Sequence, residues 1–147
     1  MNLLPIDIDS EKNLKFTAPA CQEVITATLD FYNRVGFSKP WIGYLATEKN
    51  RWVGMGGFKG QPKAGTVEIA YGTFPEFEGQ GFGTKICKEL VQIALQTDPT
   101  LRITARTLPE QSASTTILER NNFVCLGPVW DDEDGTVWEW EYQNAKL

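Results

Sequence analysis

Residues 74–85, FPEFEGQGFGTK, place three glycines, Gly79, Gly81 and Gly83, at alternate positions. An apolar run precedes this stretch and a helical pattern follows it, so the glycines lie where a strand leads into a helix. The start of a helix exposes backbone N–H groups and the positive end of the helix dipole, which together bind anions. Glycine has no Cβ, so a phosphate can approach the backbone closely. The stretch is therefore a candidate diphosphate site, and a glycine-rich turn without a ligand is the alternative.

Two common nucleotide-binding patterns are absent from this stretch. The pattern GxxxxGK[ST] is missing because no Gly-Lys pair follows Gly79 at the required offset. The dinucleotide pattern GxGxxG is missing because the third glycine comes one residue early. The junction also lies in the middle of the chain and not after the first strand, where dinucleotide-binding folds carry their glycines.

The residue inventory restricts the chemistry. There is no histidine, which excludes Ser-His-Asp and Cys-His nucleophile systems. A general base must then be a carboxylate, Lys, Tyr, Cys or water. The three cysteines, Cys21, Cys87 and Cys125, are far apart and odd in number, which favours a reduced cytoplasmic protein. Without histidine or a CxxC pair, we expect no metal site.

Composition indicates one globular domain spanning residues 1–147, with 41% apolar and 22% charged residues. We expect neither a signal peptide nor a membrane span, since no apolar run approaches about 18 residues. The net charge of −5 argues against nucleic acid or an anionic membrane as the main partner. It favours cationic small molecules or basic polypeptides, although solubility alone explains it equally well.

Hydrophobic periodicity predicts the element order β–α–β–β–β–α–β–α–β–β. This order is typical of an α/β domain whose mixed sheet is covered by helices. The predicted strands lie in the first dozen residues and at 41–47, 51–58, 66–74, 101–108, 123–127 and 137–142. The predicted helices are residues 20–35, a segment from the glycine stretch to before Pro99, and residues 112–121.

Two segments together resemble the GNAT superfamily of acetyl-CoA-dependent N-acetyltransferases. Residues 67–90, VEIAYGTFPEFEGQGFGTKICKEL, are similar to its strand–loop–helix motif, and residues 108–127, LPEQSASTTILERNNFVCLG, to its next motif. The second is closest to the ribosomal-protein N-acetyltransferase branch. The resemblance implies a single-domain, mixed and mostly antiparallel sheet of six to seven strands. Three to four helices would flank this sheet, and its central strand pair would be splayed.

The resemblance also implies that acetyl-CoA binds as co-substrate and that a primary amine attacks its thioester directly in a ternary complex. Backbone groups of the splayed strand would bind the pantetheine arm, and loop N–H groups would hold the diphosphate. A backbone N–H near Thr73 would polarise the thioester carbonyl. The implied cofactor-binding residues are Tyr71, Gly72, Thr73, Gln80, Gly81, Phe82, Gly83, Thr84 and Gln111.

Three positions depart from the family pattern. Glu78 stands where Gln or Arg is usual, so Lys85 and Lys88 become candidates for the missing positive charge. Gln111 stands where Asn is common, and it would contact the pantetheine arm or serve the start of the helix. Asn122 replaces a common Gly, a mild change because Asn tolerates a left-handed backbone.

Glu68 and Ser114 are the candidate catalytic residues. Period-two alternation places Glu68 on one strand face with Ala70 and Gly72, where its carboxylate would take the proton of the amine. A water relay, or a merely solvent-facing Glu68, is the alternative. Many family members protonate the thiolate with a Tyr, and Leu118 stands at that position here, so this acid is missing. The ribosomal-protein branch has a Ser one turn earlier, where this chain has Ser114, so the resemblance implies Ser114 as the partner of the thiolate. A surface serine is the alternative.

Other functions stay open at this point. The missing Tyr and the presence of Glu78 are compatible with a catalytically silent acyl-CoA-binding module. The Trp-rich C-terminal strand, with Trp138, Trp140 and Tyr142 alternating, is compatible with core packing or a homodimer contact. Lining of an acceptor pocket and a ligand-free interaction domain are the alternatives. Cys87 is expected in the core and not as a nucleophile.

Overall fold

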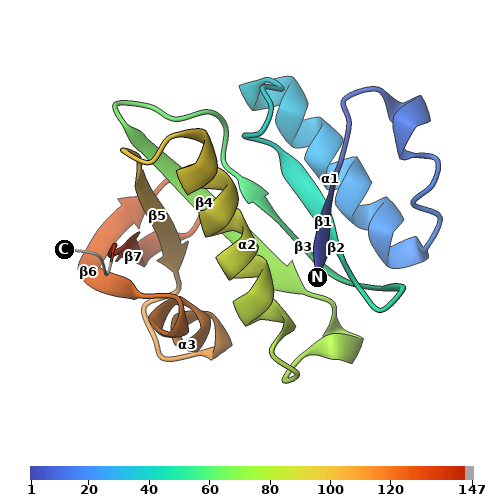
Figure 1. Ribbon diagram of the computed structural model, residues 1–147. Coiled ribbons are helices and arrows are strands. Elements are labelled where there is room, and N and C mark those ends of the chain that lie inside the picture. The colour runs from blue at the N-terminus through green and yellow to red at the C-terminus, as the bar shows by residue number, and fades with distance from the viewer. Residues whose placement is uncertain (145–147) are drawn as a thin grey trace.

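The computed structural model describes residues 1–144, and the elements follow the predicted order. The described residues form three α-helices and one sheet, with two 3₁₀ turns, Ser10–Asn13 and Pro75–Phe77. Figure 1 shows how the helices are arranged around the sheet. The strands are β1 Asn2–Pro5, β2 Gly43–Glu48, β3 Arg51–Phe58, β4 Thr66–Thr73, β5 Arg102–Thr107, β6 Phe123–Asp131 and β7 Gly135–Tyr142. The helices are α1 Pro19–Val35, α2 Phe82–Thr97 and α3 Ala113–Arg120.

The seven strands form one sheet in the order β1-β2-β3-β4-β5-β7-β6. Only the β4–β5 pair is parallel in this described sheet, and its other neighbours run antiparallel. The parallel pair is joined by α2, as a crossover connection between parallel strands requires. A mixed, mostly antiparallel sheet of seven strands with three helices in the described residues confirms the predicted fold class.

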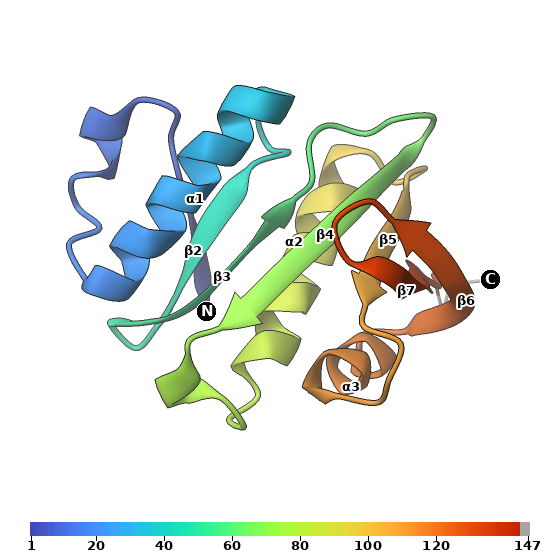
Figure 2. The same ribbon diagram turned by 180° about the vertical axis from the view of Figure 1, so that it is seen from behind.

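Strands β4 and β5 separate partway along their length. Their register runs from Thr66 opposite Arg102 to Ile69 opposite Ala105. Beyond this point β4 continues to Thr73 while paired with β3 on its other side. Figure 2 shows the two strands diverging toward α3. The predicted splay is confirmed, and it leaves one edge of residues 70–73 without a neighbouring strand in the described sheet.

Helices α1 and α2 cover opposite faces of the sheet. A Cβ atom at Gly43 would lie 2.9 Å from Cγ2 of Thr28 in α1, and one at Gly56 would lie 2.7 Å from Cγ2 of Ile86 in α2. Gly43 pairs with Gly57, the neighbour of Gly56, and successive strand residues point to opposite faces. The sheet is thus the middle of three layers.

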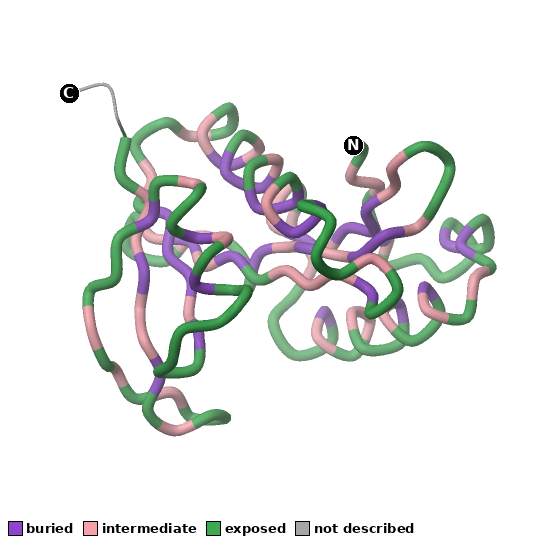
Figure 3. The backbone as a smooth tube through the Cα atoms, turned by 90° about the horizontal axis from the view of Figure 1, so that it is seen from below, coloured by how far each residue is buried: buried purple, intermediate pink, exposed green. Residues whose placement is uncertain are grey.

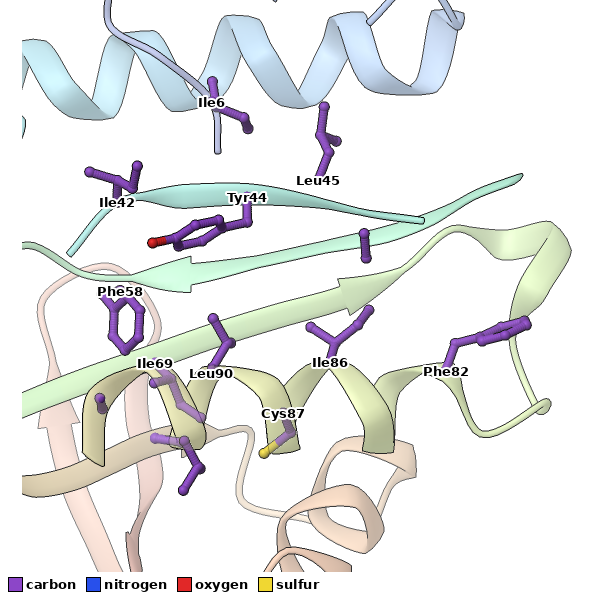
Figure 4. Close-up of a cluster of buried hydrophobic side chains, with 14 of the residues drawn as sticks. Ile6, Ile42, Tyr44, Leu45, Phe58, Ile69, Phe82, Ile86, Cys87 and Leu90 are labelled. Atoms are coloured by element: carbon purple, nitrogen blue, oxygen red, sulfur yellow. The ribbon is translucent and has the colours of Figure 1, made fainter. Parts of the chain in front are cut away.

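Apolar side chains pack in both spaces between the sheet and these helices. Figure 4 shows Ile86 and Leu90 pointing from α2 to the sheet, while Leu45 points to α1. Buried positions recur along the strands and on the inner sides of the helices in Figure 3. Cys87 is fully buried, and this burial raises the pKa of its thiol to about 12. Trp140 is also buried, so both residues pack in the core as expected.

Strand β6 is longer than predicted. The predicted strand ends at Gly127, whereas the observed one continues through Pro128 to Asp131. A glycine-proline pair normally indicates a turn. Here β6 is an edge strand with a register shift between Cys125 and Gly127, and Gly127 adopts a φ of 106°. An edge strand tolerates proline because the missing N–H need not join a ladder. In the described chain, no helix has the length and apolar character required to cross a membrane.

Candidate functional site

The three glycines of residues 79–83 serve two different purposes. Gly79 and Gly81 adopt left-handed φ values of 76° and 85°, which a side chain would strain, and the space beside them is open. Gly83 instead allows close packing, because a Cβ there would lie 2.5 Å from Cδ1 of Ile117 and 3.3 Å from Oγ1 of Thr73. The loop therefore turns sharply at two glycines, and the third brings α2 against α3 and β4.

The start of α2 is built to receive an anion. Gly81 is the N-cap residue, no side chain caps the helix, and no acidic residue occupies its first turn. The first backbone N–H groups of a helix have no intrahelical acceptor, and here their side of the loop is lined with glycine. Thr84 Oγ1 is buried in the same turn without a hydrogen-bond partner in the described structure. This helix start therefore offers several unused donors.

A cleft of about 570 Å³ joins this helix start to the open edge of β4. Residues of α3, among them Ser114 and Ile117, form another part of its lining. The cleft brings together most of the predicted binding residues: Tyr71, Gly72, Thr73, Gly81, Phe82, Gly83 and Thr84. One elongated cleft thus combines free donors at a helix start with an unpaired strand edge.

Gln80 and Gln111 do not line this cleft. The side chain of Gln80 turns back to donate to the Glu76 carbonyl at 3.4 Å, while Gln111 Oε1 accepts from Thr115 Oγ1 at 3.0 Å. Gln111 therefore contacts the first turn of α3, which was one of the two roles considered for it. Ser112 caps that helix in a reciprocal arrangement with Thr115.

Arg120 is a cleft residue that the sequence reasoning missed. Among the residues that the structure describes, it is the one Lys or Arg that lines the cleft, where it accompanies Glu78. A signal was present, since Ala113, Ile117 and Arg120 recur at helical spacing on one side of α3. Lys85 does not line the cleft: its Nζ lies 2.7 Å from Glu48 Oε1.

Two hydroxyl-bearing residues meet where β4 approaches α3. The Tyr71 hydroxyl donates to the backbone carbonyl of Ser114 at 3.2 Å, and both residues line the cleft. Burial raises the pKa of Tyr71, which keeps its phenol protonated. Leu118 is fully buried in the core, so its position supplies no polar group to the cleft.

Glu68 belongs to a cluster of five charged side chains on the α1 face of the sheet. Its Oε2 lies 2.9 Å from Lys59 Nζ, and its Oε1 lies 3.9 Å from Arg106 Nε. Arg106 also donates to Asp131 at 2.9 Å and approaches Glu139 at 3.5 Å. Because Arg106 directly follows the last residue of β5 that pairs with β4, this ion cluster lies at the point where the strands part.

The predicted catalytic residues are not in direct contact. Ser114 lines the large cleft, and it also lines a polar cleft of about 360 Å³ that contains Lys59 and Arg106 of the ion cluster. Glu68 lines neither cleft, but it lies on the strand face that also presents Ala70 and Gly72. Glu68 is linked to the polar cleft through its ion pairs with Lys59 and Arg106, which line it.

Residues 10–124 match a family model that is described as acetyltransferase (GNAT) domain. Among solved structures, the ribosomal L7/L12 α-N-protein acetyltransferase RimL with coenzyme A has a TM-score of 0.66 at 16% identity. That match covers 95% of this chain and 91% of RimL. A chimera of the spermidine N-acetyltransferase SpeG from Vibrio cholerae and hSSAT has a TM-score of 0.68 at 14% identity, with 97% and 95% covered.

The aminoglycoside acetyltransferase AAC(6')-Ib with acetyl-CoA and an aminoglycoside has a TM-score of 0.61 at 20% identity. This match covers 70% of the present chain and 64% of that enzyme, so the chain spans just under two thirds of its length. At these identities the structural likenesses establish the fold. No curated protein sequence matches the chain.

Asp131, a member of the ion cluster, should make the thermal stability of the protein depend on pH. Backbone N–H groups and the Arg106 guanidinium lower the pKa of Asp131 from 3.8 to about 2, the N–H of Glu133 contributing most. A carboxyl whose pKa is lowered on folding stabilises the fold above its unfolded pKa, and this contribution is lost as pH falls through the folded value. We therefore expect Asp131→Asn to lower the unfolding temperature at pH 7, and the difference from wild type to shrink between pH 3.8 and about 2.

Thermal unfolding followed by circular dichroism at a series of pH values measures this effect. The control is Asp132→Asn, a change at an exposed neighbour outside the ion cluster, which should leave the unfolding temperature nearly unchanged at each pH. A difference between Asp131→Asn and wild type that stays constant down to about pH 2 would contradict the assignment.

Proposed function

The chain belongs to the GNAT acetyltransferase family, and from this premise we propose that it transfers the acetyl group of acetyl-CoA to a primary amine. One observation carries the proposal: the open edge of β4 and the uncapped start of α2 lie in one cleft of about 570 Å³. An acyl-CoA has a matching shape, with an extended amide-containing arm attached to a diphosphate. The solved relatives support acetyl-CoA, since RimL is in complex with coenzyme A and AAC(6')-Ib with acetyl-CoA.

The residues of the cleft suit the two parts of this co-substrate. Backbone groups of Tyr71, Gly72 and Thr73 would pair with the pantetheine amides in place of a neighbouring strand. N–H groups of residues 80–84 would hold the diphosphate at the helix start. Arg120 would supply the positive charge that Glu78 does not, because a guanidinium forms charge-assisted hydrogen bonds with phosphate oxygens.

The transfer itself needs a neutral amine and a stabilised leaving group. The amine nitrogen attacks the thioester carbonyl, the carbon–sulfur bond breaks, and the sulfur leaves as a thiolate. A backbone N–H near Thr73 would stabilise the negative oxygen that forms during the attack. Ser114 would donate a hydrogen bond to the thiolate, in the corner of the cleft that also holds the Tyr71 hydroxyl.

Glu68 is our proposed proton acceptor for the attacking amine. Its carboxylate lies on the same strand face as Ala70, whose small side chain lines the cavity on the α1 side of the sheet. It lies two residues before the open edge of β4, so a water molecule would relay the proton where the amine does not reach it directly. Lys59 and Arg106 hold the carboxylate in place by their positive charges.

Turnover tests the proposal. We expect the protein to release the CoA thiol from acetyl-CoA when a panel of primary amines is supplied, and mass spectrometry should show the acetylated amine. The panel should include alkylamines, arylalkylamines, polyamines, an aminoglycoside and peptides with free N-termini. Acetyl-CoA binding without any acetylated product would instead support a catalytically silent acyl-CoA-binding module. This is the main alternative function, because the buried Leu118 stands where many family members have the Tyr that protonates the thiolate.

Replacement of Glu68 tests its role. Glu68→Gln should lower kcat by about a hundredfold at neutral pH, the lower end of the usual contribution of a general base, with little change in the KM for acetyl-CoA. The loss should diminish as pH rises, because hydroxide and free amine then replace the missing base.

The matched control is Glu139→Gln, which removes another carboxylate beside Arg106 but lies on β7, away from β4. Its kcat should stay within about threefold of wild type, as expected for a surface substitution. Equal losses in the two variants would show that the ion cluster, and not a base at Glu68, limits the rate.

A further inference from the structure

A second cavity, of about 340 Å³, lies on the α1 face of the sheet. Helix α1 forms one wall of it with Val24, Ala27 and Phe31, and strands β3 and β4 form the floor with Met55 and Ala70. We call this cavity the α1 groove. The floor of the groove lies close to the backbone of the sheet, because the strands carry small residues there, among them Gly57 and Ala70.

The α1 groove adjoins the large cleft at the strand that divides them. Tyr71 lines both cavities, and its neighbours Ala70 and Gly72 line the groove and the cleft respectively. A molecule in the groove would therefore lie next to the open edge of β4, where the thioester is proposed to lie. Glu68 lies on this same strand face, so the proposed base and the groove are on one side of the sheet.

The groove contains no acidic side chain among its described lining residues, and its one charged group is Lys59. Its tyrosine hydroxyls are already engaged: Tyr32 donates to the Ile6 carbonyl at 2.8 Å, and Tyr44 donates to the Pro40 carbonyl at 2.7 Å. A polycation placed here would lose hydration, and the described lining offers it no carboxylate, since the nearby Glu68 carboxylate is already paired with Lys59.

The polar cleft on the other side of the ion cluster is a poor alternative for a polycation. Asp131 there is paired with Arg106 and also accepts from the backbone N–H groups of Glu133 and Asp134. Lys59 and Arg106 also line that cleft beside the acidic residues Glu110, Asp131 and Asp134, so a polycation there would meet two fixed positive charges. The α1 groove has no carboxylate among its described lining residues with which several ammonium groups could pair.

We propose that the α1 groove binds the acceptor, and that this acceptor is a primary amine on an uncharged apolar body, such as an arylalkylamine. This inference rests on the proposed acetyl transfer and deepens it. Apolar walls favour a hydrophobic body. Acceptors that carry additional charges are disfavoured, because these charges lose their hydration in the groove and find no oppositely charged partner there. This acceptor class differs from those in the names of two similar structures, the spermidine N-acetyltransferase SpeG chimera and the aminoglycoside acetyltransferase AAC(6')-Ib.

Initial rates with 2-phenylethylamine, hexylamine, spermidine and kanamycin test this assignment, with CoA thiol release and product mass as readouts. We expect kcat/KM for 2-phenylethylamine to exceed that for spermidine by about tenfold or more. A preference for spermidine or kanamycin would overturn the proposal.

A charge introduced at the edge of the groove should change this preference. Ala27 is exposed on α1 and lines the groove, so Ala27→Glu should place a carboxylate there without disturbing the core. We expect the ratio of kcat/KM for 2-phenylethylamine to that for spermidine to fall by about tenfold. The control Asn33→Glu adds the same charge at an exposed position of α1 outside the groove and should leave the ratio unchanged.

Direct binding separates failure of this inference from failure of the proposed function. If no amine is acetylated, acetyl transfer fails, and calorimetric titration of 2-phenylethylamine into the protein with CoA present still tests the groove. A dissociation constant for 2-phenylethylamine that Ala27→Glu changes and Asn33→Glu leaves unchanged would support the groove as a site for apolar amines. Absence of binding, or equal binding in both variants, would overturn it.

Discussion

The separation of β4 from β5 after Ile69 and Ala105 is the constraint on which the candidate site depends. A parallel pair that stayed hydrogen-bonded to its end would leave no free backbone groups in the middle of the sheet. Here the last residues of β4 keep β3 on one side and have an open edge on the other. The chain then turns through the glycine loop, so the start of α2 lies beside that open edge.

Three regions around this opening differ in charge: the α2 side, the point where the strands separate, and the α1 groove. The α2 side offers backbone donors and Arg120, which suit an anionic ligand. The point of strand separation carries the ion cluster around Arg106, in which each carboxylate has a cationic neighbour. The α1 groove is apolar and has Lys59 as its one charged lining residue in the described chain. An anionic co-substrate and an apolar acceptor would thus approach from different sides of β4.

Much of the fold could be predicted from the sequence, because its signals are local. Helical spacing, β-branched runs and the glycine loop indicated the element order, and two motifs indicated the strand separation. The role of Gly83 was not predictable, since it depends on Ile117 from another helix. The ion cluster also remained hidden, because it assembles Arg106 of β5, Asp131 of β6 and Lys59, the residue that follows β3, from distant parts of the sequence. The sheet order that brings them together is a long-range property.

Calorimetric titration of acetyl-CoA is the most direct test of the central claim that the cleft is an acyl-CoA site. The wild type should bind acetyl-CoA and CoA with similar enthalpy but neither NAD nor ATP with comparable affinity. Arg120→Ala should weaken acetyl-CoA binding by about tenfold, the loss expected for a charge-assisted phosphate contact, whereas Arg34→Ala, on α1 and outside the cleft, should not. Absence of acetyl-CoA binding by the wild type would contradict the account, since the glycine loop would then be only a turn.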